Sequence, residues 1–187
     1  MKKKTITLIA IIAVVIIIAG SFISTYNGLN TLRSEVEESK AKISTQLQRR
    51  SELIPNLVET VKGYAKHEEG TLTAVIEARN KAVSANGINE KIDAENQLTS
   101  ALNKLFALTE AYPELKANEN FMSLQGDLTD TEDKITYARQ FYNDSAMSFN
   151  NLVEMFPSNI VASIFKFKKY DYFEATEKEK EAPKVKF

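Results

Sequence analysis

The chain contains no cysteine, and this absence removes several kinds of site at once. It excludes disulfide bonds, a thiol nucleophile, cysteine-bound zinc and a lipidated N-terminal cysteine. There is one histidine, His67, so the paired histidines of a helical zinc protease are also missing. Glycine-rich phosphate loops are absent, and no nucleophile-elbow sequence supports a Ser-His-Asp site built on His67. The sequence therefore predicts no catalytic residue, no cofactor and no metal ligand set.

Residues that form turns are also scarce. Six glycines, four prolines and no tryptophan in 187 residues indicate a chain built mostly of helix, and no alternating strand pattern is present. Three lysines occupy positions 2–4, and the rest of the chain carries 21 basic and 25 acidic residues. A mildly acidic body without a basic stripe argues against nucleic acid as a partner.

The longest uncharged stretch is "ITLIAIIAVVIIIAGSFI", the 18 residues from Ile6 to Ile23. As a helix it would extend about 27 Å, which is close to the hydrocarbon thickness of a bilayer. A cleaved secretory signal shares the basic start, but this apolar run is longer than a usual signal core. Gly20-Ser21-Phe22 leads into more apolar sequence and provides no A-x-A site. We therefore expect a retained signal-anchor that contacts the lipid bilayer through residues 6–23.

The charges on either side of this run predict its orientation. Lysines precede it, whereas Arg33, Glu35, Glu37, Glu38 and Lys40 follow it with mixed sign. By the positive-inside rule, this favours a single-pass protein with a cytoplasmic N-terminus and an external body.

Beyond the run, apolar residues follow the narrow seam of a coiled coil. Its members are Leu29, Leu32, Val36, Ile43, Leu47 and Ile54. Pro55 then interrupts the pattern, because proline lacks a backbone donor and clashes with the carbonyl four residues earlier. The sequence predicts a turn near Leu53-Ile54, with Pro55 as the first residue of a second helix that runs to about Val83. The residues on either side would then face each other as a helical hairpin.

The remaining pattern predicts three more helical segments. Asn86-Gly87 marks a loop, a third helix ends at Ala111-Tyr112-Pro113, and a long helix covers Phe121–Phe156 before Pro157. "SNIVASIF" predicts a short helix that packs back on the bundle. The fold class is all-α, an N-terminal transmembrane helix followed by an elongated antiparallel bundle of about four helices. We expect an anchor at 1–25, a helical bundle at 26–165 and a tail at 166–187, whose charged part, "EATEKEKEAPKVKF", is disordered.

Two groups of polar residues are candidate sites. His67, Glu68 and Glu69 are consecutive, so they diverge around a helix, and a solvated charged turn explains them better than a metal site. Arg79, Glu132 and Arg139 lie close to apolar stripes, where an unpaired charge would be costly. We expect these three to form inter-helix ion pairs that set register, and we count them with Pro55 as structural candidates.

Several segments, taken in order, resemble the LemA family. They are "YNGLNTL", "QLQRRSELIPNLVETVKGYAKHE", "EARNKA", "LTDTEDKITYARQFYND" and "FNNLVEMFPSNIVASIFKF", which together extend from Tyr26 to about Phe173. The resemblance implies a membrane-attached helical bundle with an N-terminal anchor. It supplies no mechanism and no catalytic residue.

These observations support a non-enzymatic scaffold or interaction module at the cell envelope, which binds protein partners or associates with itself. The alternative is a signalling adaptor or sensor that works through the anchor helix. A hydrolase or metal-binding enzyme that uses His67 has the least support. Bound metal or turnover would favour the enzyme, and a stable membrane complex would favour the scaffold. Dependence on the anchor's own sequence would favour the sensor.

Overall fold

The computed structural model describes residues 2–173, and these residues form helices and no strand. The helices in chain order are α1 (Lys2–Tyr64), α2 (Glu69–Ser84), α3 (Ile88–Leu108), η1 (Thr109–Ala111, a 3-10 turn), α4 (Pro113–Lys116), α5 (Glu119–Glu154) and α6 (Ser158–Ile164). The all-α class is confirmed. The disorder expected for "EATEKEKEAPKVKF" falls on residues 174–187, which lie outside the described part of the chain.

The described residues divide into two compact units. One unit combines residues 2–39 with 141–172, and the other combines residues 40–140 with Phe173. Two helices, α1 and α5, contribute to both units. The division of the body into a bundle at 26–165 and a tail from 166 stays a prediction.

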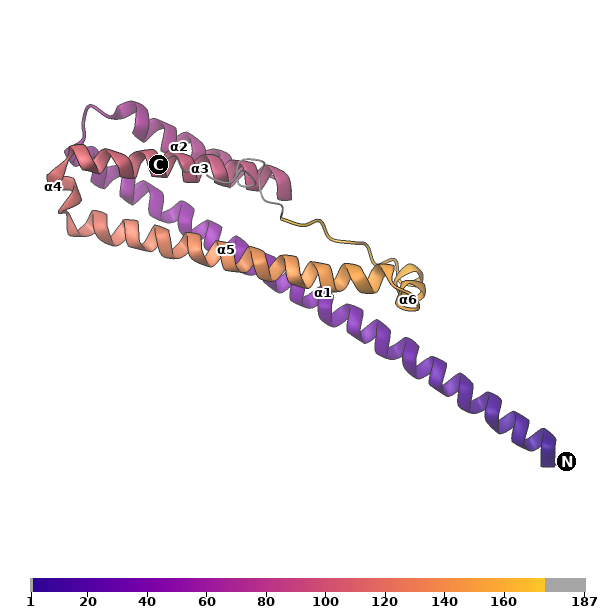
Figure 1. The fold of residues 1–187 in the computed structure, drawn as a ribbon. Coiled ribbons are helices and arrows are strands. Elements are labelled where there is room, and N and C mark those ends of the chain that lie inside the picture. Colours follow the sequence, from indigo (N-terminus) through magenta and orange to yellow (C-terminus); the bar gives the residue numbers. More distant parts are fainter. Residues whose placement is uncertain (1, 174–187) are drawn as a thin grey trace, which may run out of the picture. The chain divides into compact units, whose positions relative to one another are not determined.

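Helix α1 is continuous from Lys2 to Tyr64 (Figure 1). It is the one helix among residues 2–173 that is long and apolar enough to cross a membrane. Side chains of its uncharged run, such as Ile6 and Ile17, are 65% and 70% exposed. The same helix continues directly into the seam at Leu29 and Val36, both fully buried. The helix therefore passes from the uncharged run to the packed seam without a break.

The turn predicted at Pro55 is wrong, because Pro55 lies inside α1. A proline at this position cannot donate to the carbonyl of Ser51, four residues earlier. Arg79 of α2 supplies the missing donor: its Nε donates to the Ser51 carbonyl oxygen at 3.1 Å. A donor that comes from another helix thus satisfies the carbonyl that the proline leaves unbonded. Nothing in the sequence around residue 55 indicates that Arg79 supplies this donor.

The reversal of the chain occurs about ten residues later than predicted, at residues 65–68. Helix α1 closes with a hydrogen bond from Ala65 N to Val61 O, and α2 opens with Leu72 N bonded to Glu68 O. The prediction of one continuous helix from Pro55 to about Val83 is therefore wrong. The reversal returns Leu72 and Val75 to the core, whereas a straight helix would leave that stripe without a partner.

The unit of residues 40–140 is a bundle of four helical segments. Helices α2 and α3 run side by side in Figure 1, joined by residues 85–87. Segments of α1 and α5 complete it, with Arg49 bonded to Asp127 between them. A single apolar core fills the unit, made of Ile54, Leu57, Val58, Val61, Ala65, Leu72, Val75, Ala78, Leu98, Leu102, Leu105, Leu115, Phe121 and Leu128.

The unit of residues 2–39 and 141–172 packs α1 against the C-terminal part of α5. Helix α5 ends at Glu154, close to the predicted end before Pro157, and α6 follows as the predicted short helix. After α6, residues 165–172 continue without helix and lie against α1 and α5, where Tyr170 Oη donates to Glu37 Oε1 at 2.9 Å. We call residues 166–172 the C-terminal strap.

Candidate functional site

The most polar part of the interior is a charge cluster in the four-helix unit. We define the charge cluster as Arg50 of α1, Glu95 of α3, and Glu132 and Arg139 of α5. Arg50 Nη1 lies 2.9 Å from Glu95 Oε2 and 2.7 Å from Glu132 Oε2. The side chains of Arg50 and Glu95 are 4% and 6% exposed, whereas that of Glu132 is 37% exposed. One buried guanidinium therefore joins three helices.

Further contacts hold the same guanidinium in place. Arg50 Nη2 donates to Thr99 Oγ1 at 2.8 Å, one helical turn beyond Glu95. Burial raises the pKa of Glu95 above its usual value, although the positive charges of Arg50 and Arg139 lower it in part. The charge of Glu132 acts with the burial and raises this pKa further. The cluster is thus an ion-pair network in which one carboxyl group is shifted toward holding a proton.

Chemically, this arrangement holds opposite charges together across three helices. A buried guanidinium that loses its carboxylate partners is costly, so we expect the cluster to favour the axial position of α1, α3 and α5 in which the charges meet. Both carboxylates of the cluster lie against the Arg50 guanidinium.

Sequence reasoning placed Glu132 and Arg139 beside a packed seam, and the structure brings both into the cluster. Their role in setting register stays a prediction. Sequence reasoning missed Arg50 and Glu95, although the heptad spacing contains a signal for Arg50. Leu29, Val36, Ile43, Arg50 and Leu57 are spaced by seven, so Arg50 occupies a core position of the heptad.

Arg79 does not join the charge cluster. It is half-buried on α2, where Nε bonds the Ser51 carbonyl and Nη1 donates to Asn80 Oδ1 at 3.2 Å. The structure therefore brings together two of the four structural candidates, Arg79 and Pro55. They meet at the Ser51 carbonyl, which the sequence does not single out.

His67 lies in the exposed turn between α1 and α2. Its neighbour Glu68 accepts a hydrogen bond from Tyr112 Oη at 3.1 Å, so this carboxylate binds the residue that joins η1 to α4. Among residues 2–173, no group of three or more histidine and carboxylate side chains is placed to hold a metal ion.

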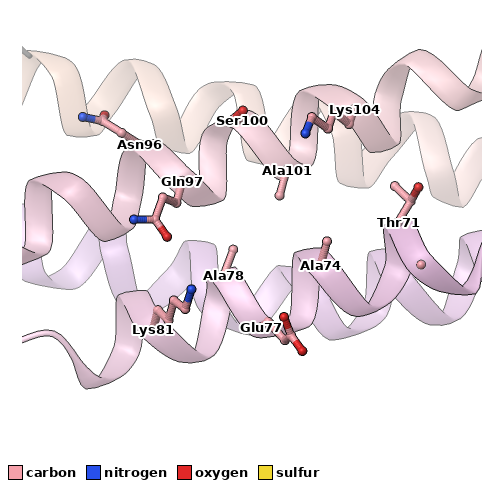
Figure 2. A pocket seen from close by; sticks show the side chains of 11 residues that line it. Thr71, Ala74, Glu77, Ala78, Lys81, Asn96, Gln97, Ser100, Ala101 and Lys104 are labelled. Atoms are coloured by element: carbon pink, nitrogen blue, oxygen red, sulfur yellow. The ribbon is translucent and has the colours of Figure 1, made fainter. Parts of the chain in front are cut away.

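A groove of about 680 Å³ lies between α2 and α3. Figure 2 shows the methyl groups of Ala74 and Ala78 on α2 pointing toward Ala101 on α3. Lys81 and Lys104 line the groove as well, together with amide and hydroxyl side chains. The groove exists because small residues face each other along two antiparallel helices.

In the other unit, Asn150 binds the C-terminal strap. Its amide donates to the Tyr170 carbonyl at 2.9 Å and accepts from the Tyr170 N–H at 2.9 Å, and it is 5% exposed. Tyr142 Oη donates to the Asp171 carbonyl at 3.0 Å, and burial raises the pKa of Tyr142 to about 12. Asn150 thus pairs with the strap as a second backbone would. Sequence reasoning gave this residue no role.

Comparison with known proteins gives one family and several relatives. The family model described as LemA family matches residues 39–187. The magnetosome protein MamQ of Magnetospirillum gryphiswaldense is 25% identical over 92% of this chain and 74% of its own length. MamQ 2 of Paramagnetospirillum magneticum is 24% identical over 89% and 70%. Protein LemA of Metamycoplasma hominis is 24% identical over 85% and 73%. The matches cover most of the chain and extend through both units.

Proposed function

This chain belongs to the LemA family, and from that premise we propose that it is a non-enzymatic scaffold or interaction module held at a membrane by α1. The relatives named as magnetosome proteins carry the name of a cell structure and not of a reaction. Their names support a role in an assembly.

The observation that carries the proposal is the unbroken helix α1. Its run from Ile6 to Ile23 has no charge, and apolar side chains along it are largely exposed. An exposed surface of this kind is unfavourable in water and is stable inside a bilayer. The residues that follow are buried in helix packing, at Leu29 and Val36. One helix therefore joins the proposed span to packed helical structure.

The body also offers surfaces to a partner. In the four-helix unit, Met122, Tyr137 and Val83 are 59%, 71% and 60% exposed. Aromatic and methionine side chains are enriched where proteins bind one another. We propose that a protein partner, or a second copy of this chain, binds at such positions.

Photo-cross-linking in intact membranes tests the scaffold. A photoreactive residue at position 122 should capture the same protein in repeated experiments, and that protein should co-purify with the full chain in detergent. The matched control places the photoreactive residue at the neighbouring position 121, because Phe121 is 1% exposed and should capture nothing outside the chain. Absence of any specific product at exposed positions 83, 122 and 137 would count against the scaffold.

A sensor is the second candidate, and the same continuity of α1 favours it. The two functions differ in what they require of the span. If residues 6–23 are replaced by an equally long run of leucine and alanine, a scaffold should keep its captured partner. A sensor that signals through the helix should lose its phenotype while it remains in the membrane.

For the orientation, we propose a cytoplasmic N-terminus and an external body, in line with the lysines at 2–4 and the mixed charges after the span. The chain has no cysteine, so a single introduced thiol reports its own location. In intact cells, a membrane-impermeant maleimide should label Tyr137→Cys and should label Thr5→Cys only after lysis. The opposite pattern would reverse the assignment.

A further inference from the structure

An exposed apolar patch lies at the junction of α5 and α6. We define the junction patch as Met155, Phe156, Ile160, Ile164 and Phe165, which are 62%, 80%, 50%, 58% and 47% exposed. Contiguous exposed apolar surface of this kind marks a site of contact with a protein, a ligand or a membrane.

Helix α6 has two different sides. Ser158, Val161 and Ala162 are buried against the unit, whereas Ile160 and Ile164, four residues apart, share the exposed side. Packing within the unit therefore accounts for one side of α6 and leaves the isoleucines without an internal function.

The position of the junction patch identifies what covers it. The ring of Phe165 lies 6.0 Å from that of Phe22 and 4.5 Å from that of Tyr26, measured between centroids. Phe22 is the penultimate residue of the uncharged run, and Tyr26 follows this run by one turn. The ring contacts of Phe165, the residue after α6, thus place this end of the patch beside the end of the proposed span. Figure 1 shows α6 at the end of α5.

The side chains around the patch match the chemistry of a bilayer surface. Tyrosine is enriched at the boundary between lipid headgroups and acyl chains, and interfacial helices bury phenylalanine side chains there. Phe165 contacts Phe22 and Tyr26 at this place, and Phe156 belongs to the same patch as an exposed ring. Exposed lysines follow directly, at positions 166, 168 and 169, of which Lys169 pairs with Glu154. Lysines next to an inserted apolar surface favour anionic headgroups.

We propose that the junction patch inserts into the headgroup–acyl boundary of the leaflet from which α1 emerges, as a second membrane contact beside the span. This inference rests on the proposed membrane anchoring by α1. It gives the short helix α6 a function: the chain is held to the bilayer by a crossing helix and by an interfacial helix that packs against it.

The absence of tryptophan allows a direct test in the full chain. Single variants Phe156→Trp and Phe165→Trp place a fluorophore in the patch. Phe141→Trp is the matched control, since Phe141 is 49% exposed in the same unit and lies about 20 Å before the end of α5. Ile17→Trp reports the span. Each protein is reconstituted into vesicles of phosphatidylcholine and phosphatidylglycerol, with and without a lipid that carries a quencher near the glycerol.

The expected result is quenching at positions 156 and 165, by roughly twofold or more, with little at 141. Removing phosphatidylglycerol should weaken quenching at 156 and leave position 17 unchanged. Matching circular dichroism spectra establish that the variants fold alike, and two positions in the patch guard against a local defect of either substitution.

Other outcomes overturn the proposal in distinguishable ways. Quenching at 17 with strong iodide quenching at 156 and 165 would place the patch in water and leave the anchor intact. Protection at 156 from both iodide and lipid quenchers would mean that a second copy or another part of the protein covers the patch. No lipid quenching at 17 would reject the membrane span, and the present inference with it.

Discussion

Arg50 shows how a single residue can decide the packing of several helices. It stands in a heptad position that apolar residues occupy before and after it, and it contacts Glu95 and Glu132 on two other helices. We expect Arg50→Met to lower the free energy of unfolding by about 3–5 kcal/mol, because the Glu95 carboxylate then loses its buried partner. Urea denaturation of the full chain in detergent micelles, followed by circular dichroism, measures the change.

The neighbouring arginine provides the control. Arg49 pairs with Asp127 at 2.9 Å, but these side chains are 45% and 39% exposed. Solvent screens such a pair, so Arg49→Met should cost no more than about 1 kcal/mol. The double variant Arg50→Met/Glu95→Leu should recover most of the loss, because it removes both buried charges. Equal losses for Arg49→Met and Arg50→Met would contradict the account of the charge cluster.

The raised pKa of Glu95 predicts a pH dependence of stability. Because burial raises the pKa of this acid in the folded chain, the folded state binds the proton more tightly than the unfolded state. Stability from this residue is then present at low pH. It falls as the pH rises from the usual value of 4.5 through the raised pKa.

The variant Glu95→Gln cannot titrate at this position, so the difference between wild type and variant isolates the residue. We expect the free energy of unfolding of wild type, relative to Glu95→Gln, to decrease across this interval. Unfolding in urea at a series of pH values gives the difference. A relative stability that increases with pH would mean that the arginines, and not burial, dominate.

At the scale of helices, periodicity in the sequence was a good guide to what is buried. In α5, Phe121, Leu128, Ile135, Tyr142 and Phe149 are spaced by seven and at most 3% exposed. These stripes predicted the helices because an apolar face must be covered. The same reasoning failed where a polar group is bonded by a residue from another helix. The Arg79 donor comes from 28 residues beyond Ser51, and the partner of Glu95 comes from another helix.

The proline in α1 gives a prediction about two helices together. Pro55→Ala should stabilise the chain by roughly 1–3 kcal/mol, because alanine restores the donor and removes the clash within the helix. Arg79→Met should destabilise the wild type by about 1–3 kcal/mol, since the Ser51 carbonyl then lacks its donor.

The two changes should be coupled. In the Pro55→Ala background, the new N–H bonds Ser51, so Arg79→Met should cost less than in wild type. Denaturation midpoints of the four proteins measure this cycle. Additive effects would mean that the bond from Arg79 does not compensate for the proline.

The Asn150 amide makes two hydrogen bonds to the backbone of the C-terminal strap. Asn150→Ala removes both hydrogen bonds to the Tyr170 backbone and should cost about 1–3 kcal/mol. Hydrogen exchange should rise in residues 166–172 before it rises in α5. Asn151→Ala is the matched control, because Asn151 is exposed and should leave the exchange of the strap unchanged. Unchanged exchange in Asn150→Ala would show that other contacts hold the strap.

For the whole molecule, composition predicted the class well, since a chain poor in glycine and proline with one long uncharged run leaves few alternatives. The division into units was not predictable, because it depends on which stretch of α1 packs with which stretch of α5. Periodicity is the same in both halves of these helices and does not reveal where one unit ends.

The span should be present in the mature protein. Its apolar core exceeds the length usual in a cleaved signal, and residues 20–22 lack a suitable cleavage site. Intact mass of protein extracted from membranes should therefore include residues 6–23. A mature N-terminus between Gly20 and Thr25 would show that the run is a signal sequence.

The continuity of α1 also sets a rotational phase. Phe22, Leu29 and Val36 are spaced by seven, so the packed side of the helix extends into the proposed span. One alanine inserted between Ser24 and Thr25 would turn Phe22 by about 100° away from that side. Seven inserted residues would restore the phase to within roughly 20° and lengthen the helix by about 10 Å. The distance of the packed residues from the lipid and their rotation about the axis of α1 can thus be varied separately. Both depend only on the number of residues in one helix.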